Sequence, residues 1–398
     1  MMKSIPKADM HVHLEGTITP AMVEKLAKRN NISVPEGLIE NGKYNWKGDG
    51  TARGDLLAFV LAYDSATAVL KTEQDYTDIT YDYLKQVADE GCIYAEIAIS
   101  PSLGIPYPQM LKAIEKGYEK AKKETGIEAR FISTCVRHLG PKEALKAAQI
   151  TRDNPHPLVT GFGMAGDENA YTAADFKPAF DLSGLRNRTP HAGEAAGPES
   201  VRAAIDVLKA RRFGHMVRAI EDEKLMKDLQ AIKAVPEVCV SSNLALHVYE
   251  NYAAHPLRKL FDAGLKVVLG SDDPSFFSTS IGHEYQIAKD KFRFTDEELR
   301  QITRNAIEEA FIDEKTRQQL LKRLDKKDPP APPPRVSLIA PAPAVWGGSR
   351  AGAYRLCCRC CCRDMRAGYS GHSPDYCAFP WRTNTSRERL SSHVPRPL

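Results

Sequence analysis

The chain has 398 residues, 42% of them hydrophobic and 27% charged, which is typical of a globular protein and excludes a disordered or fibrous chain. No run of about 18 apolar residues occurs, so we expect neither a membrane span nor a membrane partner. Residues 1–325 hold 43 Lys and Arg against 47 Asp and Glu, and this mildly acidic balance argues against nucleic acid as the partner.

The N-terminal residues lack the apolar stretch of a secretory signal. The three cysteines before residue 326, Cys92, Cys135 and Cys239, are scattered as in proteins of a reducing compartment. We therefore expect a cytoplasmic protein. Nothing in the sequence indicates an oligomeric state.

A change of composition near residue 325 predicts the domain organisation. Residues 328–334 read Asp-Pro-Pro-Ala-Pro-Pro-Pro, which cannot continue a helix. We expect one domain over residues 1–325, followed at 326–398 by a Pro-rich linker and a disordered tail. A metal- or redox-active tail through residues 357–362 is the alternative, but these cysteines lack the Cys-x₂₋₄-Cys spacing of zinc fingers.

Apolar or β-branched runs alternate with helical segments along residues 1–325. Eight such runs separated by helices predict an α/β fold, a (β/α)₈ TIM barrel, with a doubly wound sheet as the rival. The expected strands are 9–13, 93–100, 130–136, 159–166, 188–193, 212–216, 237–243 and 266–272, and the clearest helices are 20–29, 107–125, 198–210, 255–263 and 314–324.

Polar residues capable of binding a metal end several of these strands, where the active sites of such barrels lie. His11 and His13 are two apart in a strand, so both side chains project from one face and could bind zinc together. The alternative is that they are ordinary polar residues at a strand end. His191 ends another strand and Glu194 follows it, although a satisfied histidine and a solvated acid would look the same.

The last predicted strand ends in Asp272 and Asp273. Adjacent acids repel each other, so a nearby cation is the economical explanation, with a simple Asp-Pro turn as the alternative. His215 ends a further strand and is free for acid–base work if three histidines and one aspartate hold the metal. Zinc in such a site lowers the pKa of a bound water to about 7.

These residues, in this order, resemble the adenosine deaminase family of the metal-dependent amidohydrolases. The resemblance spans about residues 5–324, and the order of its motifs, four of which are catalytic, makes it specific. The motifs are Pro-Lys-Ala-Asp-Met-His-Val-His-Leu-Glu-Gly at 6–16, Ala-Gly-Asp-Glu at 165–168, His-Ala-Gly-Glu at 191–194, Gly-His at 214–215, Ser-Asn at 242–243, His-Pro at 255–256 and Ser-Asp-Asp-Pro at 271–274.

The resemblance implies a role for each residue. One Zn²⁺ per chain would be held by His11, His13, His191 and Asp272. His215 would orient the zinc water and take its proton, and Glu194 would protonate purine N1. Asp273 would bond N7 and the backbone N–H of Gly166 would bond N3, so that His13, Glu15, Gly166 and Asp273 contact the substrate.

The implied activity is deamination of adenosine, and of 2′-deoxyadenosine, to inosine and ammonia in purine salvage or catabolism. Glu15 departs from this expectation, because adenosine-specific members often have Asp there and adenine-specific relatives usually have Glu. Adenine or an N6-substituted purine is therefore the alternative substrate. A non-catalytic zinc- or purine-binding protein on the same scaffold is the alternative of another class.

Two further features belong to the resemblance. Met216 stands where the family often has Gly, and we expect it to narrow the pocket. The long connection from residue 14 to about 90 carries Leu56, Phe59, Val60 and Tyr63 at helical spacing. We expect this insertion to form a helical lid over the sugar side of the pocket, with core packing as the alternative.

Overall fold

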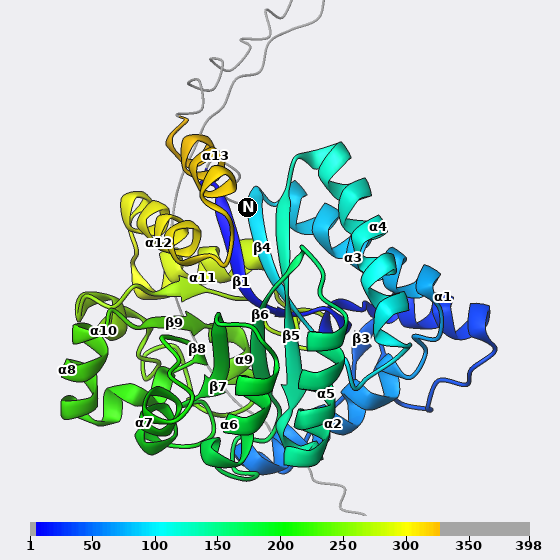
Figure 1. Ribbon diagram of the computed structural model, residues 1–398, viewed down its shortest axis with the longest axis horizontal. Coiled ribbons are helices and arrows are strands. Elements are labelled where there is room, and N and C mark those ends of the chain that lie inside the picture. The colour runs from blue at the N-terminus through cyan, green and yellow to red at the C-terminus, as the bar shows by residue number, and fades with distance from the viewer. Residues whose placement is uncertain (1–4, 327–398) are drawn as a thin grey trace, which may run out of the picture. The chain divides into compact units, whose positions relative to one another are not determined.

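The computed structural model describes residues 5–326. Their main sheet has eight parallel strands in sequence order, and the first strand meets the segment just after the last strand at a bridge between Val12 and Asp272. The sheet is thus a nearly closed barrel, and the predicted (β/α)₈ fold is confirmed (Figure 1). The strands are β1 (Lys7–His13), β4 (Cys92–Ile99), β5 (Glu128–Val136), β6 (Val159–Ala165), β7 (Arg188–Ala192), β8 (Arg212–His215), β9 (Val235–Val238) and β10 (Val268–Leu269).

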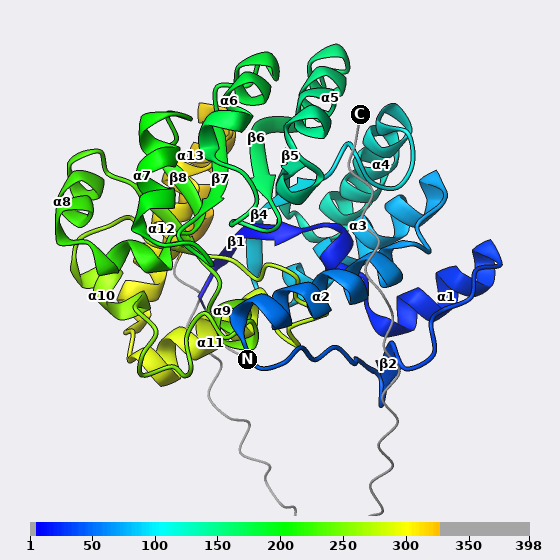
Figure 2. The same cartoon turned by 90° about the horizontal axis from the view of Figure 1, so that it is seen from below.

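Helices surround the strands in both views (Figures 1 and 2). They cover the outer face of the sheet, so each strand is buried on both sides and reads as an apolar run. The helices are α1 (Pro20–Asn30), α2 (Ala52–Thr67), α3 (Glu73–Asp89), α4 (Tyr107–Thr125), α5 (Pro141–Asp153), α6 (Ala173–Leu182), α7 (Pro198–Asp206), α8 (Glu223–Ala231), α9 (Val240–Ala245), α10 (Leu257–Asp262), α11 (Ile281–Phe292), α12 (Asp296–Glu309) and α13 (Glu314–Asp325).

The sequence signals explain where several helices begin. Thr19 precedes Pro20, and the Thr19 side chain accepts a hydrogen bond from the backbone of Met22, so α1 starts as predicted. Thr72 and Asp75 form a capping box that starts α3. These caps satisfy backbone N–H groups that have no partner within the helix.

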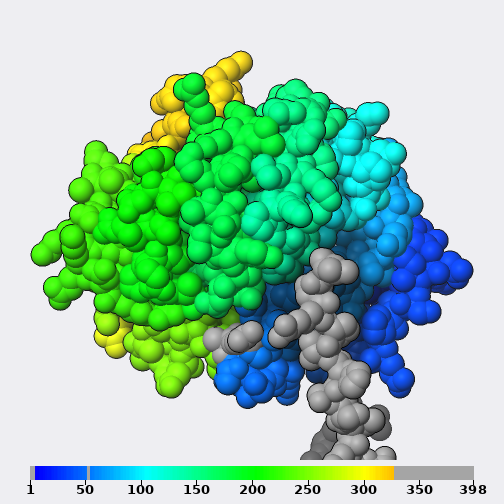
Figure 3. Space-filling model, turned by 60° about the horizontal axis from the view of Figure 1, so that its bottom comes forward, coloured from blue at the N-terminus to red at the C-terminus, as the bar shows by residue number. Residues whose placement is uncertain are grey.

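The connection between β1 and β4 is a helical insertion. It contains α1, a hairpin of β2 (Ile39–Glu40) and β3 (Lys43–Tyr44), then α2 and α3. Oδ2 of Asp55 in α2 lies 2.5 Å from Nδ1 of His247, which fixes the start of α2 against the segment after α9. In Figure 3 the blue atoms of this part of the chain meet the green atoms of later elements along one face.

The prediction of a strand over 237–243 is wrong after its first residues. β9 ends at Val238, and Val240–Ala245 turns into α9, where the amide of Asn243 donates to the carbonyl of Cys239. The amide of Val240 leaves the sheet because it donates to Oε2 of Glu284, 3.1 Å away. The predicted strand 266–272 is likewise reduced to β10.

Within residues 5–326, every helix is too short or too polar to cross a lipid bilayer. The predicted linker and tail, 326–398, and the alternative metal role of its cysteines lie outside the described residues, apart from residue 326.

Candidate active site

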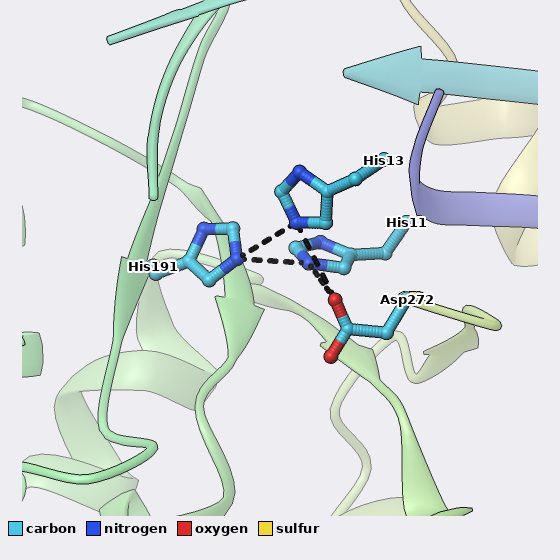
Figure 4. Close-up of side chains that lie close together, drawn as sticks. All are labelled: His11, His13, His191 and Asp272. Atoms are coloured by element: carbon cyan, nitrogen blue, oxygen red, sulfur yellow. Dashed lines mark hydrogen bonds and ion pairs between the residues drawn. The ribbon is translucent and has the colours of Figure 1, made fainter. Parts of the chain in front are cut away.

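Four side chains converge on one point, and they come from β1, from β7 and from the segment just after β10 (Figure 4). Nε2 of His191 lies 3.1 Å from Nε2 of His11 and 3.3 Å from Nε2 of His13. Oδ1 of Asp272 lies 3.4 Å from Nε2 of His13 and 3.8 Å from that of His11. The ligand atoms of the four residues all lie within 4.8 Å of one another, so the structure brings together the whole predicted metal set.

The donor chemistry of this cluster fits a cation. His11 uses Nδ1 to bond Oε2 of Glu237 at 2.8 Å, which leaves a lone pair on Nε2 that faces the other three side chains. Burial, and then the charges of His11 and His215, lower the pKa of His191 well below its ordinary value, so its imidazole is neutral as a ligand must be. Three nitrogens and one carboxylate oxygen are a donor set that zinc prefers.

Excess negative charge around His13 supports the same conclusion. Burial opposes a charge on this imidazole, but Asp273, Asp272 and Glu15 outweigh it and raise the pKa of His13 to about 9. The pocket therefore draws a positive charge even though it is buried. A bound metal would supply that charge and displace the proton.

Backbone conformation at the rim is unusual for residues that are not glycine. His215, Met216 and Asp272 have φ values of 59°, 57° and 60°. Such left-handed backbone costs about 1–3 kcal/mol and tends to cluster at active sites. Gly214 precedes them because a Cβ there would lie 2.7 Å from Cε1 of His11 and 3.0 Å from Nδ1 of His191.

Glu194 and His215 lie beside the four candidate metal ligands, which together form the metal cluster. Oε2 of Glu194 lies 3.4 Å from Nε2 of His215, whose ring lies behind that of His11 at 5.0 Å between centroids. Burial raises the pKa of Glu194 well above its ordinary value, and the charges of Asp272 and Glu168 add to this rise. A protonated Glu194 is what donation to a ring nitrogen requires. Burial also lowers the pKa of His215 to about 3, so this ring is neutral.

Asp272 and Asp273 are placed differently despite their adjacency. Burial works against ionisation of Asp272, but a hydrogen bond with His13 and the charges of His215 and His11 hold its pKa well below the ordinary value. Burial raises the pKa of Asp273 well above the ordinary value, and the charge of Asp272 adds to the rise although His13 opposes it. The pKa values of the two adjacent acids are therefore shifted in opposite directions.

A cavity of about 450 Å³ opens beside the cluster. Leu56, Phe59, Val60 and Tyr63 of α2 line it, so the insertion after β1 does form a wall of the pocket. Met216 does not narrow it as expected, because this side chain is fully buried in the core and is not among the described residues that line the cavity. The lining also includes His13, Glu15, Gly166, His191, Glu194, His215, Asp272 and Asp273.

Comparisons with known proteins agree with this geometry. The family model described as adenosine deaminase matches residues 6–327. The chain belongs to the adenosine deaminase family. It is 44% identical to an adenine deaminase of Agrobacterium fabrum, over 81% of this chain and 99% of that protein. It is 41% identical to an adenine deaminase of Rhizobium rhizogenes, over 81% and 100%.

Solved structures extend the comparison. An adenine deaminase of Arthrobacter aurescens superposes with a TM-score of 0.73 at 28% identity, covering 80% of this chain and 98% of that one. An amidohydrolase of Burkholderia ambifaria with bound Zn gives 0.71 at 25% identity, covering 81% and 90%. The chain is a hydrolytic deaminase of the amidohydrolase superfamily that acts on C–N bonds of purines, and its family is metal-dependent.

The roles of three residues of the site were not predicted from the sequence. Glu237 binds His11, and Arg212 in turn holds Glu237 with Nη2 at 2.7 Å. Glu168 accepts hydrogen bonds from the loop that carries Glu194. Glu168 stood within a recognised motif without a role, whereas Glu237 and Arg212 belong to no motif and become visible only when the barrel closes around them.

Proposed function

We propose that the chain deaminates adenine to hypoxanthine and ammonia with one Zn²⁺ ion, as a cytoplasmic enzyme of purine salvage. The similarity to proteins named adenine deaminase, at 40–44% identity over 81% of the chain, supports adenine. This revises the substrate order that the motifs alone suggested, since adenosine was the first expectation.

The environment of Glu15 is the observation that best supports the proposal. Its side chain is buried, lines the cavity, and has Oε1 without a hydrogen-bond partner among the described residues. Burial raises the pKa of Glu15 to about 7, so its carboxyl holds a proton part of the time near neutral pH. Such a group can accept a hydrogen bond from N9–H of a free base, whereas N9 of adenosine has no hydrogen to donate.

The residues of the site can divide the chemistry as follows. When bound by His11, His13, His191 and Asp272, zinc supplies hydroxide at neutral pH by lowering the pKa of water to about 7. Glu194 gives its proton to N1, which makes C6 electrophilic. Asp273 in its neutral form donates to N7, and the amide of Gly166 donates to N3. His215 orients the water oxygen that adds to C6 and takes its proton, and that proton then passes to the amino group, which leaves as ammonia when the C6–N bond breaks.

Adenosine remains the second candidate because of the size of the cavity. About 450 Å³ is more than a single purine base needs, and the residues of α2 lie on one side of it. A sugar could occupy that space if the carboxyl of Glu15 accepted its hydroxyl instead of N9–H.

Turnover of adenine, adenosine and guanosine by zinc-loaded protein, followed in the ultraviolet purine band, tests the proposal. We expect kcat/KM for adenine to exceed that for adenosine by about 100-fold or more, because a buried acceptor without its donor is costly. Glu15→Asp, which opens one methylene of space, should narrow this ratio. A higher kcat/KM for adenosine would reverse the substrate order, and no turnover of any aminopurine would reject deamination.

A further inference from the structure

The carboxylate of Glu168 is bound almost entirely by one loop of the chain. Glu168 follows β6, is 3% exposed, and faces the loop between β7 and α7. Oε1 accepts from the amide of Gly193 at 2.5 Å and from the hydroxyl of Ser200. Oε2 accepts from the amides of Glu194 and Ala196, both at 2.9 Å.

These hydrogen bonds provide partners for backbone amides of a loop that belongs to no helix or sheet. The amides of residues 193, 194 and 196 all point to one carboxylate that lies 25–28 residues earlier in the chain. Buried amides need partners, and Glu168 supplies the partner for all three of these amides, while Arg218 binds the carbonyls of Gly193 and Ala195. Glu194 lies in the middle of that loop, and its own backbone N–H is one of the donors.

Glu168 is itself held firmly. The guanidinium of Arg137, which is 5% exposed, donates to the carbonyl of Ala170 at 2.9 Å and to that of Tyr171 at 3.3 Å. The segment after β6 is thereby fixed to the end of β5. The hydrogen bonds that Glu168 accepts therefore join two neighbouring loops at one rim of the barrel, those that follow β6 and β7.

We propose that Glu168 is a positioning residue that holds the carboxyl of Glu194 against the substrate through the amides of residues 193, 194 and 196. The inference rests on the proposed role of Glu194 as the acid. The charge of Glu168 acts in the same direction, because it contributes to the raised pKa of Glu194.

Glu168→Gln is the test variant. Its amide group replaces one oxygen, so at least one backbone N–H of the loop then faces another donor. We expect kcat to fall about 10- to 100-fold, as for a displacement of about 1 Å at a reacting group, while KM changes less than about threefold. Glu199→Gln is the matched control, since Glu199 accepts from the amide of Gly197 in the same region but contacts none of the three loop amides; its kcat should match the parent enzyme.

A double-mutant cycle separates positioning from a general loss of structure. In a Glu194→Gln background, Glu168→Gln should cost less than about threefold further in kcat, because the group that it positions is already absent. Losses that multiply in full would overturn the proposal, and so would a parent-like kcat in Glu168→Gln alone. A parent-like rate in Glu194→Gln alone would instead reject the acid role in the proposed function.

Glu168→Asp covers the case in which the Gln variant does not fold. It keeps the charge but withdraws the oxygens by one methylene, so we expect the same direction of change, with a smaller loss of kcat. Thermal unfolding of each variant with zinc shows that the protein assayed is folded. A folded Asp variant with the kcat of the parent enzyme would contradict the proposal.

Discussion

Glu194 is a buried carboxyl that lies among other acids, and both conditions favour its protonated form. Burial and the nearby charges of Asp272 and Glu168 raise its pKa, and Nε2 of His215 lies 3.4 Å from its Oε2. We expect Glu194→Gln to lower kcat by about 10²–10⁴, the usual contribution of a general acid. Zinc content, measured by atomic absorption, should stay the same, and near-parent rates would count against the acid role.

The direction of the Glu194 pKa shift also predicts the pH dependence. The required form is protonated, so it is fully present below the raised pKa and is lost as the pH rises through it. We expect kcat to persist at pH values well above 4.5, where an ordinary carboxyl has lost its proton, and to fall only as the pH rises through the raised pKa of Glu194. A pH profile of kcat checks this, with Glu199→Gln as the control that keeps the same alkaline limb. A kcat that falls as the pH rises from about 4 to 6 would contradict this prediction.

At the scale of an element, backbone strain and side-chain packing have opposite effects on stability at Met216, in the turn after β8. Met216 has φ of 57°, which favours glycine by about 1 kcal/mol, yet its side chain is fully buried. Removing a buried methionine side chain costs about 2–5 kcal/mol, so packing outweighs backbone strain. We expect Met216→Gly to lower the free energy of unfolding by about 2–4 kcal/mol in urea titrations.

Met216→Ala is the matched control for this prediction. It removes nearly the same volume but keeps a Cβ in left-handed backbone, so it should be less stable than the Gly variant by up to about 1 kcal/mol. An Ala variant more stable than the Gly variant would show that the backbone at residue 216 carries no strain.

The elements also show what the sequence could predict and why. The buried parallel strands read as apolar runs and the ligands end them, so the barrel and the residues of the metal cluster were predictable in chain order. The segment from Val240 was not, because Val238 and Val240 together indicate a continuing strand while the buried carboxylate of Glu284 binds the amide of Val240. Glu237 and Glu168 act through partners that are 226 and 25–28 residues away, which no local pattern records.

At the scale of the whole molecule, the candidate metal site lies where the first and last strands of the barrel meet. Its ligands come from β1, β7 and the residue that bridges to β1 after β10. A metal that binds only the folded chain stabilises it by about 2.7 kcal/mol at 100 times its Kd. We expect chelation to lower Tm by about 5–10 °C, as measured by calorimetry.

Re-addition of zinc should restore the Tm, whereas magnesium should not, because magnesium prefers oxygen ligands. A Tm that is insensitive to the chelator, in protein shown to be free of metal, would mean that the cluster closes without a cation.

The peptide at Asp272 has two tasks at once. Its N–H donates to the carbonyl of His11, and its C=O accepts from the amide of His13. The residue that closes the barrel is thus the same one whose carboxylate faces the imidazoles. A slip of one residue along that seam would turn alternate side chains to the opposite surface and scatter the donors. The alignment of the candidate ligands and the closure of the barrel therefore depend on the same residue.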